Sequence, residues 1–322
     1  VILLWTDLDE RGQLHSYDPT ADPAFPEGIR TVPFRDLSWS ADGGVVFFGI
    51  ADWEDKFVPT GEDTDGEEDD SEEEDAHEDP ATVEIWHWAD TFVMPWQKVH
   101  ASQDRRRNML AAWHVESGEF VQLGQDLIEE RVTPIEYTEM AYVAEWSKYA
   151  MERSIGRPGA DIYLQDIGTG ERTLMVENIN DRYLEESPGG KYLLYMDDGH
   201  FWTIHVGTRE ITNITVGAAV SFIDYESDQT SKVYPDELQK PPFGVAGWTT
   251  DDAGVLLYDE CDIWVVATDG SGAERLTDGS AEEVRHRLVR PELAVQSRWA
   301  PPEFDSREEE WIDLDQPVYL SL

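Results

Sequence analysis

The chain has 322 residues and a formal charge of −45, because 69 acidic residues outnumber 24 Lys and Arg. Nucleic acids and anionic lipid surfaces are bound by clustered basic side chains, so this balance argues against both as partners. The single cysteine, Cys261, excludes an internal disulfide and a multi-thiolate metal site. The longest mostly apolar stretch, Thr215–Ile223, is far shorter than the roughly 18 residues of a membrane helix. We therefore predict no nucleic-acid partner, no membrane insertion, no cofactor and no metal site.

Two short sequence units recur along the chain and predict β-sheet. The first is a hairpin in which two strands flank a turn of small residues, where glycine supplies the positive φ of a tight turn. Its copies are Trp113–Leu123, Leu164–Leu174, Ile204–Ile214 and Val265–Leu276. The second is a turn rich in Ser, Asp and Gly followed by an unbroken apolar run, at Trp39–Phe48, Ser187–Tyr195 and Trp248–Tyr258. Such a run is typical of a strand that is covered on both faces.

Repetition of these units predicts an all-β fold, a β-propeller with four-stranded blades. In chain order, residues 1–17 form the outer half of a blade, and residues 36–123 form a complete one. Further blades span residues 137–174, 181–215 and 243–277, an irregular excursion covers 216–242, and residues 284–322 begin another blade. About four complete blades and two partial ones do not close a ring. We therefore predict that residues 1–322 are a single partial propeller domain, a fragment of a larger propeller. Only Tyr137–Ser154 could form a short helix.

One segment differs from the rest of the chain in composition. Residues 61–80 contain 13 acidic residues, no Lys or Arg, and Ala76 as the single apolar side chain. Such a run cannot bury enough surface to offset the entropy lost on ordering it. Asp63 and Asp65 have the first spacing of a calcium-binding loop, but Gly66 comes too early for that site. We predict a disordered acidic insertion over about residues 57–80.

We assign no catalytic residue to this chain. A serine hydrolase carries its nucleophile in a Gly-x-Ser-x-Gly turn between a strand and a helix, and this pentapeptide does not occur. Ser271 lies in a predicted hairpin turn, and the carboxylates around Cys261 raise the pKa of its thiol and weaken it as a nucleophile. His200 and His205 flank a strand, where a polar hairpin is favoured over a metal site. This chain alone is therefore predicted to be inactive.

The one basic cluster is Arg105, Arg106 and Arg107. On a predicted strand, these side chains would project to alternate faces. One interpretation is a substrate-binding patch that recognises carboxylates or carbonyls of a peptide and faces the central channel of the propeller. The other is that the three arginines pair with acidic neighbours. Nearby, Trp86 and Trp88 share one face of a predicted strand, as core residues or as part of the pore lining.

An ordered set of segments resembles the propeller of secreted bacterial peptidases of the prolyl oligopeptidase family. Many TolB-like propellers share each blade motif on its own, whereas the order and the acidic insertion are more specific. The set covers nearly the whole chain and consists of Val83–Asp90, Met94–Gln97, Gln103–Asn108, Ser187–Tyr195, Pro241–Trp248 and Tyr258–Trp264.

The resemblance implies that the propeller restricts peptide access to an α/β-hydrolase domain that follows it in the same parent chain, and that the protein is periplasmic or secreted. No catalytic residue can be transferred to this chain, which ends before such a domain. Some relatives hold the amino terminus of the substrate with a glutamate pair, but Glu185 and Glu186 lack the matching helix motif and are not assigned that role. The alternative function is a non-enzymatic TolB-like propeller that acts as a protein-binding scaffold.

The charge composition predicts a response to salt. Without residues 61–80 the chain still carries about −32, and it contains only 6 Lys against 18 Arg. This balance is expected of a protein from a salt-adapted bacterium, because the Debye length falls to roughly 3 Å at 1 M salt and self-repulsion is screened. The alternative is an ordinary acidic periplasmic protein. We expect the thermal unfolding midpoint to rise clearly as KCl increases from about 0.05 to 2 M. Sucrose of matched osmolality is the control, and a midpoint that follows both solutes equally would contradict salt adaptation.

Overall fold

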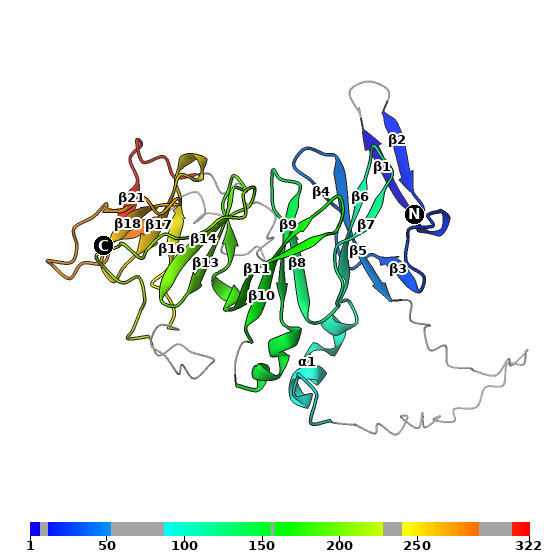
Figure 1. Cartoon of the computed structure of the whole chain (residues 1–322), viewed down its shortest axis with the longest axis horizontal. Coiled ribbons are helices and arrows are strands. Elements are labelled where there is room, and N and C mark those ends of the chain that lie inside the picture. Colours follow the sequence, from blue (N-terminus) through cyan, green and yellow to red (C-terminus); the bar gives the residue numbers. More distant parts are fainter. Residues whose placement is uncertain (7–11, 53–86, 156–157, 228–239, 290–310) are drawn as a thin grey trace, which may run out of the picture.

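The computed structural model describes residues 1–6, 12–52, 87–155, 158–227, 240–289 and 311–322, and nearly all of their regular structure is antiparallel β-sheet (Figure 1). The predicted acidic insertion at about 57–80 lies outside these residues. The helices of the described part are α1 (Met94–Asp104) and the short 3-10 helices η1 (Pro19–Ala21), η2 (Ser147–Ile155), η3 (Asp181–Tyr183) and η5 (Thr250–Asp252).

The strands form four successive meanders, which we call blades 1 to 4. Blade 1 contains β3 (Ile29–Val32), β4 (Ser38–Trp39), β5 (Val45–Asp52), β6 (Met109–His114) and β7 (Phe120–Gln122). Blade 2 contains β8 (Glu130–Pro134), β9 (Met140–Glu145), β10 (Ala160–Asp166) and β11 (Arg172–Ile179). Blade 3 contains β12 (Glu185–Glu186), β13 (Tyr192–Asp197), β14 (His200–His205) and β15 (Ile211–Asn213). Blade 4 contains β16 (Val245–Trp248), β17 (Gly254–Tyr258), β18 (Ile263–Ala267) and β19 (Ala273–Arg275).

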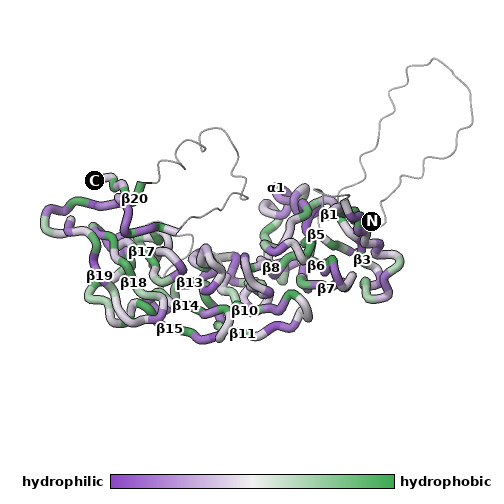
Figure 2. Tube along the Cα trace, turned by 90° about the horizontal axis from the view of Figure 1, so that it is seen from above, coloured by the Kyte–Doolittle hydropathy of each residue, from purple (hydrophilic) through white to green (hydrophobic). Residues whose placement is uncertain are grey.

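A two-stranded sheet lies at each end of this series. It is β1 (Ile2–Thr6) with β2 (Gln13–Tyr17) at one end and β20 (Arg287–Val289) with β21 (Tyr319–Ser321) at the other. Seen from above, the sheets follow one another along an open arc with the two termini at opposite ends, and the last strands β11 and β15 lie on its convex side (Figure 2). The predicted fold class, four complete blades and two partial ones, is confirmed.

The hairpin turns explain why each pair of outer strands forms. Gly118, Gly170 and Gly270 have φ values of 75°, 75° and 74°, a backbone conformation that costs other residues strain. In the third hairpin the predicted glycine does not hold this position, because Arg209 adopts the left-handed conformation instead, at φ 64°.

The core is divided into layers that lie between neighbouring sheets. Along β5, Val46, Phe48 and Ile50 pack toward the β1–β2 sheet, whereas Val45 and Phe47 pack toward blade 2. Side chains on both faces of β5 are thus buried, which is why consecutive residues of this strand are apolar. Separate clusters fill the junctions of blade 2 with blade 3 and of blade 3 with blade 4.

Several predicted boundaries are wrong. The segment Tyr137–Ser154 is not a helix, because Met140–Glu145 forms β9 and only the residues from Ser147 onward form η2. The inner strand of blade 2, β8, is short and lies before the predicted start of that blade at residue 137. Helix α1 was not predicted at all, and none of its residues is buried, so no amphipathic pattern marks it.

Candidate functional site

Helix α1 connects β5 to β6 through the long insertion of blade 1 and carries the basic cluster at its end. Pro95 lies in its first turn, where a missing N–H costs nothing, and the helix ends at Asp104 with Arg105 as its C-cap. The three arginines therefore lie at the helix end and in the turn before β6, so the prediction that they lie on a strand is wrong. Figure 1 shows α1 and η2 at the same end of blades 1 and 2.

The three arginines differ in their contacts. Arg107 donates from Nε to Asp104 at 2.8 Å, so pairing with an acidic neighbour is confirmed for this residue. Arg105 and Arg106 are exposed, and within the described part of the chain neither forms an ion pair. Both guanidinium groups are therefore available to a carboxylate or carbonyl in solution.

A stack of rings and guanidinium groups fixes α1 against blade 2. Phe92 stacks on Trp96 with centroids 4.1 Å apart, and Trp96 stacks on His100 at 3.8 Å. The guanidinium of Arg153 in η2 lies over the Phe92 ring, 4.4 Å from its centroid. It also forms a bidentate pair with Glu129 at 2.8 and 2.6 Å. Because these contacts join the first half of α1 to blade 2, they hold the helix against that blade.

The nearby tryptophans do not form the predicted strand. Trp86 lies outside the described residues. Trp88 lies in a turn closed by a bond from the His87 amide to Asp90, and its side chain is 81% exposed. It is neither a core residue nor part of a strand face, which corrects the prediction.

The other sequence candidates have structural contacts. Glu185 accepts a hydrogen bond from Trp248 Nε1 at 3.1 Å and so links blade 3 to blade 4. His205 accepts from the amides of the following turn, and His200 contacts Thr215. Ser271 lies in the β18–β19 turn, as predicted.

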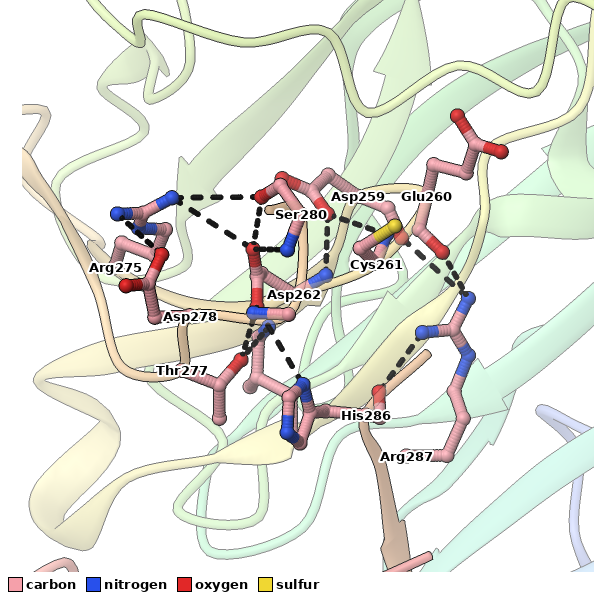
Figure 3. A network of polar contacts seen from close by, with 12 residues as sticks. Asp259, Glu260, Cys261, Asp262, Arg275, Thr277, Asp278, Ser280, His286 and Arg287 are labelled. Carbon is pink, nitrogen blue, oxygen red and sulfur yellow. Dashed lines mark hydrogen bonds and ion pairs between the residues drawn. The ribbon is translucent and has the colours of Figure 1, made fainter. Parts of the chain in front are cut away.

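Cys261 lies in a network of polar contacts between β17–β18 and the segment that follows β19 (Figure 3). Asp259 accepts from the Cys261 amide and from Trp264 Nε1, and buried Asp262 accepts from Thr277 and Ser280. Burial first, and then the charges of the three neighbouring carboxylates, raise the pKa of the Cys261 thiol, which confirms the predicted direction. The thiol is thus a poor nucleophile, and the network holds the turn in shape.

Three of the cavities in the described part of the chain lie beside or between blades. One of about 920 Å³ adjoins the Cys261 network, and one of about 570 Å³ lies between blade 4 and residues 312–315. The third, about 410 Å³, lies between blades 1 and 2. Among the described residues no three His, Cys, Asp or Glu side chains are grouped as a metal site. No helix there is both long and apolar enough to span a membrane.

Comparison with known proteins gives no match in sequence, since no family model matches the chain and no curated protein is similar to it. Solved structures give remote likenesses. TolB from Agrobacterium tumefaciens is 14% identical with a TM-score of 0.32, and the match covers 76% of this chain and 61% of the TolB chain. Oligogalacturonate lyase from Vibrio parahaemolyticus is 11% identical with a TM-score of 0.37, over 79% and 56%. Dipeptidyl peptidase 4 from Porphyromonas gingivalis is 12% identical with a TM-score of 0.38, over 81% and 34%.

The chain therefore spans between about a third and three fifths of the length of these three proteins. The assignment of propeller blades rests on the strand order and on the layered core described above.

Proposed function

We propose that this chain is the propeller region of an exported serine peptidase and that it controls the access of small peptides to an α/β-hydrolase domain of the same parent chain. The observation that carries the proposal is the pair Arg105 and Arg106, two free cations at a blade end of a chain with a formal charge of −45. A peptide carboxylate is a fitting ligand for such a pair.

Replacement of both arginines tests this role. We expect Arg105→Gln with Arg106→Gln to weaken binding of an acetylated tripeptide with a free carboxylate about three- to tenfold, since two charge-assisted contacts are lost. Binding is measured by NMR titration of the labelled chain, with the C-terminally amidated tripeptide as the uncharged partner. Arg182→Gln is the matched control, because Arg182 is also exposed and lies on η3 in another part of the chain. Equal weakening by the control, or equal affinity for both peptides, would rule out the arginine pair as a carboxylate site.

A non-enzymatic scaffold is the second candidate, and one surface favours it. Leu3, Trp5 and Leu14 share the face of the β1–β2 sheet turned away from blade 1, and each is more than half exposed. An exposed apolar sheet face is typical of a protein interaction surface. The reading frame of the parent gene separates the two functions: a downstream Gly-x-Ser-x-Gly followed by Asp and His supports the peptidase, and a hydrolase-free frame supports the scaffold.

A further inference from the structure

The turns that lead into the second strand of each blade occupy equivalent positions. In each of them, an amide bonds to the carbonyl five residues later, from Ser40 to Val45, Ile135 to Met140, Ser187 to Tyr192 and Thr249 to Gly254, at 2.8 to 2.9 Å. This shared bond aligns the four turns residue by residue. In blades 1 to 4 the residue three positions after the first one is Gly43, Thr138, Gly190 and Asp252.

At two of the three junctions between complete blades, the residue at this position fills the space between its own turn and the turn of the preceding blade. In blade 4 it is Asp252, whose buried carboxylate accepts from Ser187 Oγ at 2.7 Å and from the amides of Gly189 and Lys191 in blade 3. In blade 3 it is Gly190, which approaches the carbonyl of Glu136 so closely that a Cβ would lie 2.1 Å from the oxygen. Both junctions are filled by protein atoms.

At the junction between blades 1 and 2, the core between the sheets is packed, but the turns do not contact each other in this way. Its equivalent residue, Thr138, turns back and bonds to Ile135 and Met140 of its own turn. In blade 1, Ser40 donates to Asp42 within its own turn, whereas its equivalent Ser187 donates across the junction. The result is the cavity of about 410 Å³, which we call the blade 1–2 cleft.

The cleft combines an apolar interior with an acidic and aromatic rim. Phe47, Ile135 and Ile167 line it and are buried, at 2 to 3% exposure. Three acidic residues line it as well, Asp42, Glu136 and Glu139, whereas none of its lining residues is Lys, Arg or His.

Two exposed rings belong to the same rim. Tyr137 is 70% exposed and adopts φ 59°, a conformation that is unfavourable for a bulky side chain. Trp39 is 45% exposed, although its equivalent Trp248 is buried at 2% and donates to Glu185. Neither residue belongs to a core cluster, and each keeps a large exposed area that can contact a ligand.

We propose that the blade 1–2 cleft binds a lysine or arginine side chain of a peptide partner. The methylene stem of such a side chain suits the apolar interior, as long cationic side chains bury their stems and keep the charge near water. Its cationic head matches the three carboxylates and the π-faces of Tyr137 and Trp39. This inference goes beyond the proposed function and does not depend on it, because it concerns binding by this chain alone.

The test compares two blocked tripeptides, acetyl-Gly-Arg-Gly-amide and its citrulline analogue, which is neutral and nearly the same shape. Both are titrated into the ¹⁵N-labelled full chain at constant ionic strength. We expect the arginine peptide to bind more tightly and to shift the indole signal of Trp39 and the amide of Glu139. Equal affinity for the two peptides would refute a cation site.

Variants then locate the site. Glu136→Gln with Glu139→Gln, and separately Tyr137→Asn, should each weaken the arginine peptide about two- to fivefold. Asparagine is chosen because it tolerates the positive φ, so the ring is removed without a penalty in folding. The matched control is Glu116→Gln, an exposed carboxylate in the β6–β7 turn of blade 1. If the control weakens binding as much as the cleft variants do, the general negative field attracts the peptide and the cleft does not.

Discussion

Replacing Asp252 with alanine should lower the free energy of unfolding by about 3 kcal/mol or more, the largest single effect that we expect in this chain. The carboxylate is fully buried and accepts four hydrogen bonds, from Ser187, Gly189 and Lys191 and, at 2.6 Å, from Trp311 Nε1. Its removal leaves buried donors without partners, which costs about 1–3 kcal/mol for each donor that water cannot reach. Urea denaturation of the purified chain measures the loss, and hydrogen exchange of the Gly189 and Lys191 amides shows whether it is local.

The neighbouring residue provides a matched control. Asp251 also adopts a positive φ, 60° against 57° for Asp252, but it is exposed. We expect Asp251→Asn to change stability by less than about 0.5 kcal/mol. Asp252→Asn should lie between the two, since it keeps one acceptor and suits the positive φ. If Asp252→Ala is no more harmful than Asp251→Asn, the blade 3–4 junction does not depend on this carboxylate.

Asp262 should make part of the stability of the chain depend on pH in the acid range. Burial alone raises the pKa of this carboxyl, but hydrogen bonds from Ser280, Gly279 and Thr277 outweigh it and lower the pKa from 3.8 to about 2. A carboxylate with a lowered folded-state pKa stabilises the protein above its unfolded-state pKa, and this stabilisation is lost as the pH falls toward the folded-state value. We therefore expect wild-type chain and Asp262→Asn to differ by about 1–2 kcal/mol near pH 6, with about half of that difference gone by pH 3.

The measurement is a series of urea denaturations between pH 6 and pH 3 for both proteins, so that the titration of all other carboxylates cancels in the difference. Asp278→Asn serves as the control, because Asp278 is exposed and pairs with Arg275 at the surface. A difference between wild type and Asp262→Asn that stays constant over this range would contradict a lowered pKa at Asp262.

The blades could be predicted from the sequence because their signals are local. A turn such as Ser187-Pro-Gly-Gly followed by a run of apolar residues specifies a buried strand within about ten residues, and glycines such as Gly118 and Gly170 mark the hairpins through their positive φ. The same reasoning placed Ser271 in a hairpin turn and gave the direction in which the pKa of Cys261 is shifted. It failed for α1 and for β8, because a helix without buried residues and a short polar strand carry no periodic pattern.

The composition and the local pattern of the chain thus determined its fold class, its blades and its excess of negative charge. The contacts between blades were decided only by the tertiary structure, because they join residues far apart in the chain: Asp252 bonds to Ser187 from 65 positions away. The sequence units at Ser40 and Ser187 look alike, yet one serine bonds within its own turn and the other crosses to the next blade. Whether a junction is filled or left as a cleft depends on which side chain the neighbouring blade presents. That is a property of packing between blades, and a local sequence pattern contains no information about it.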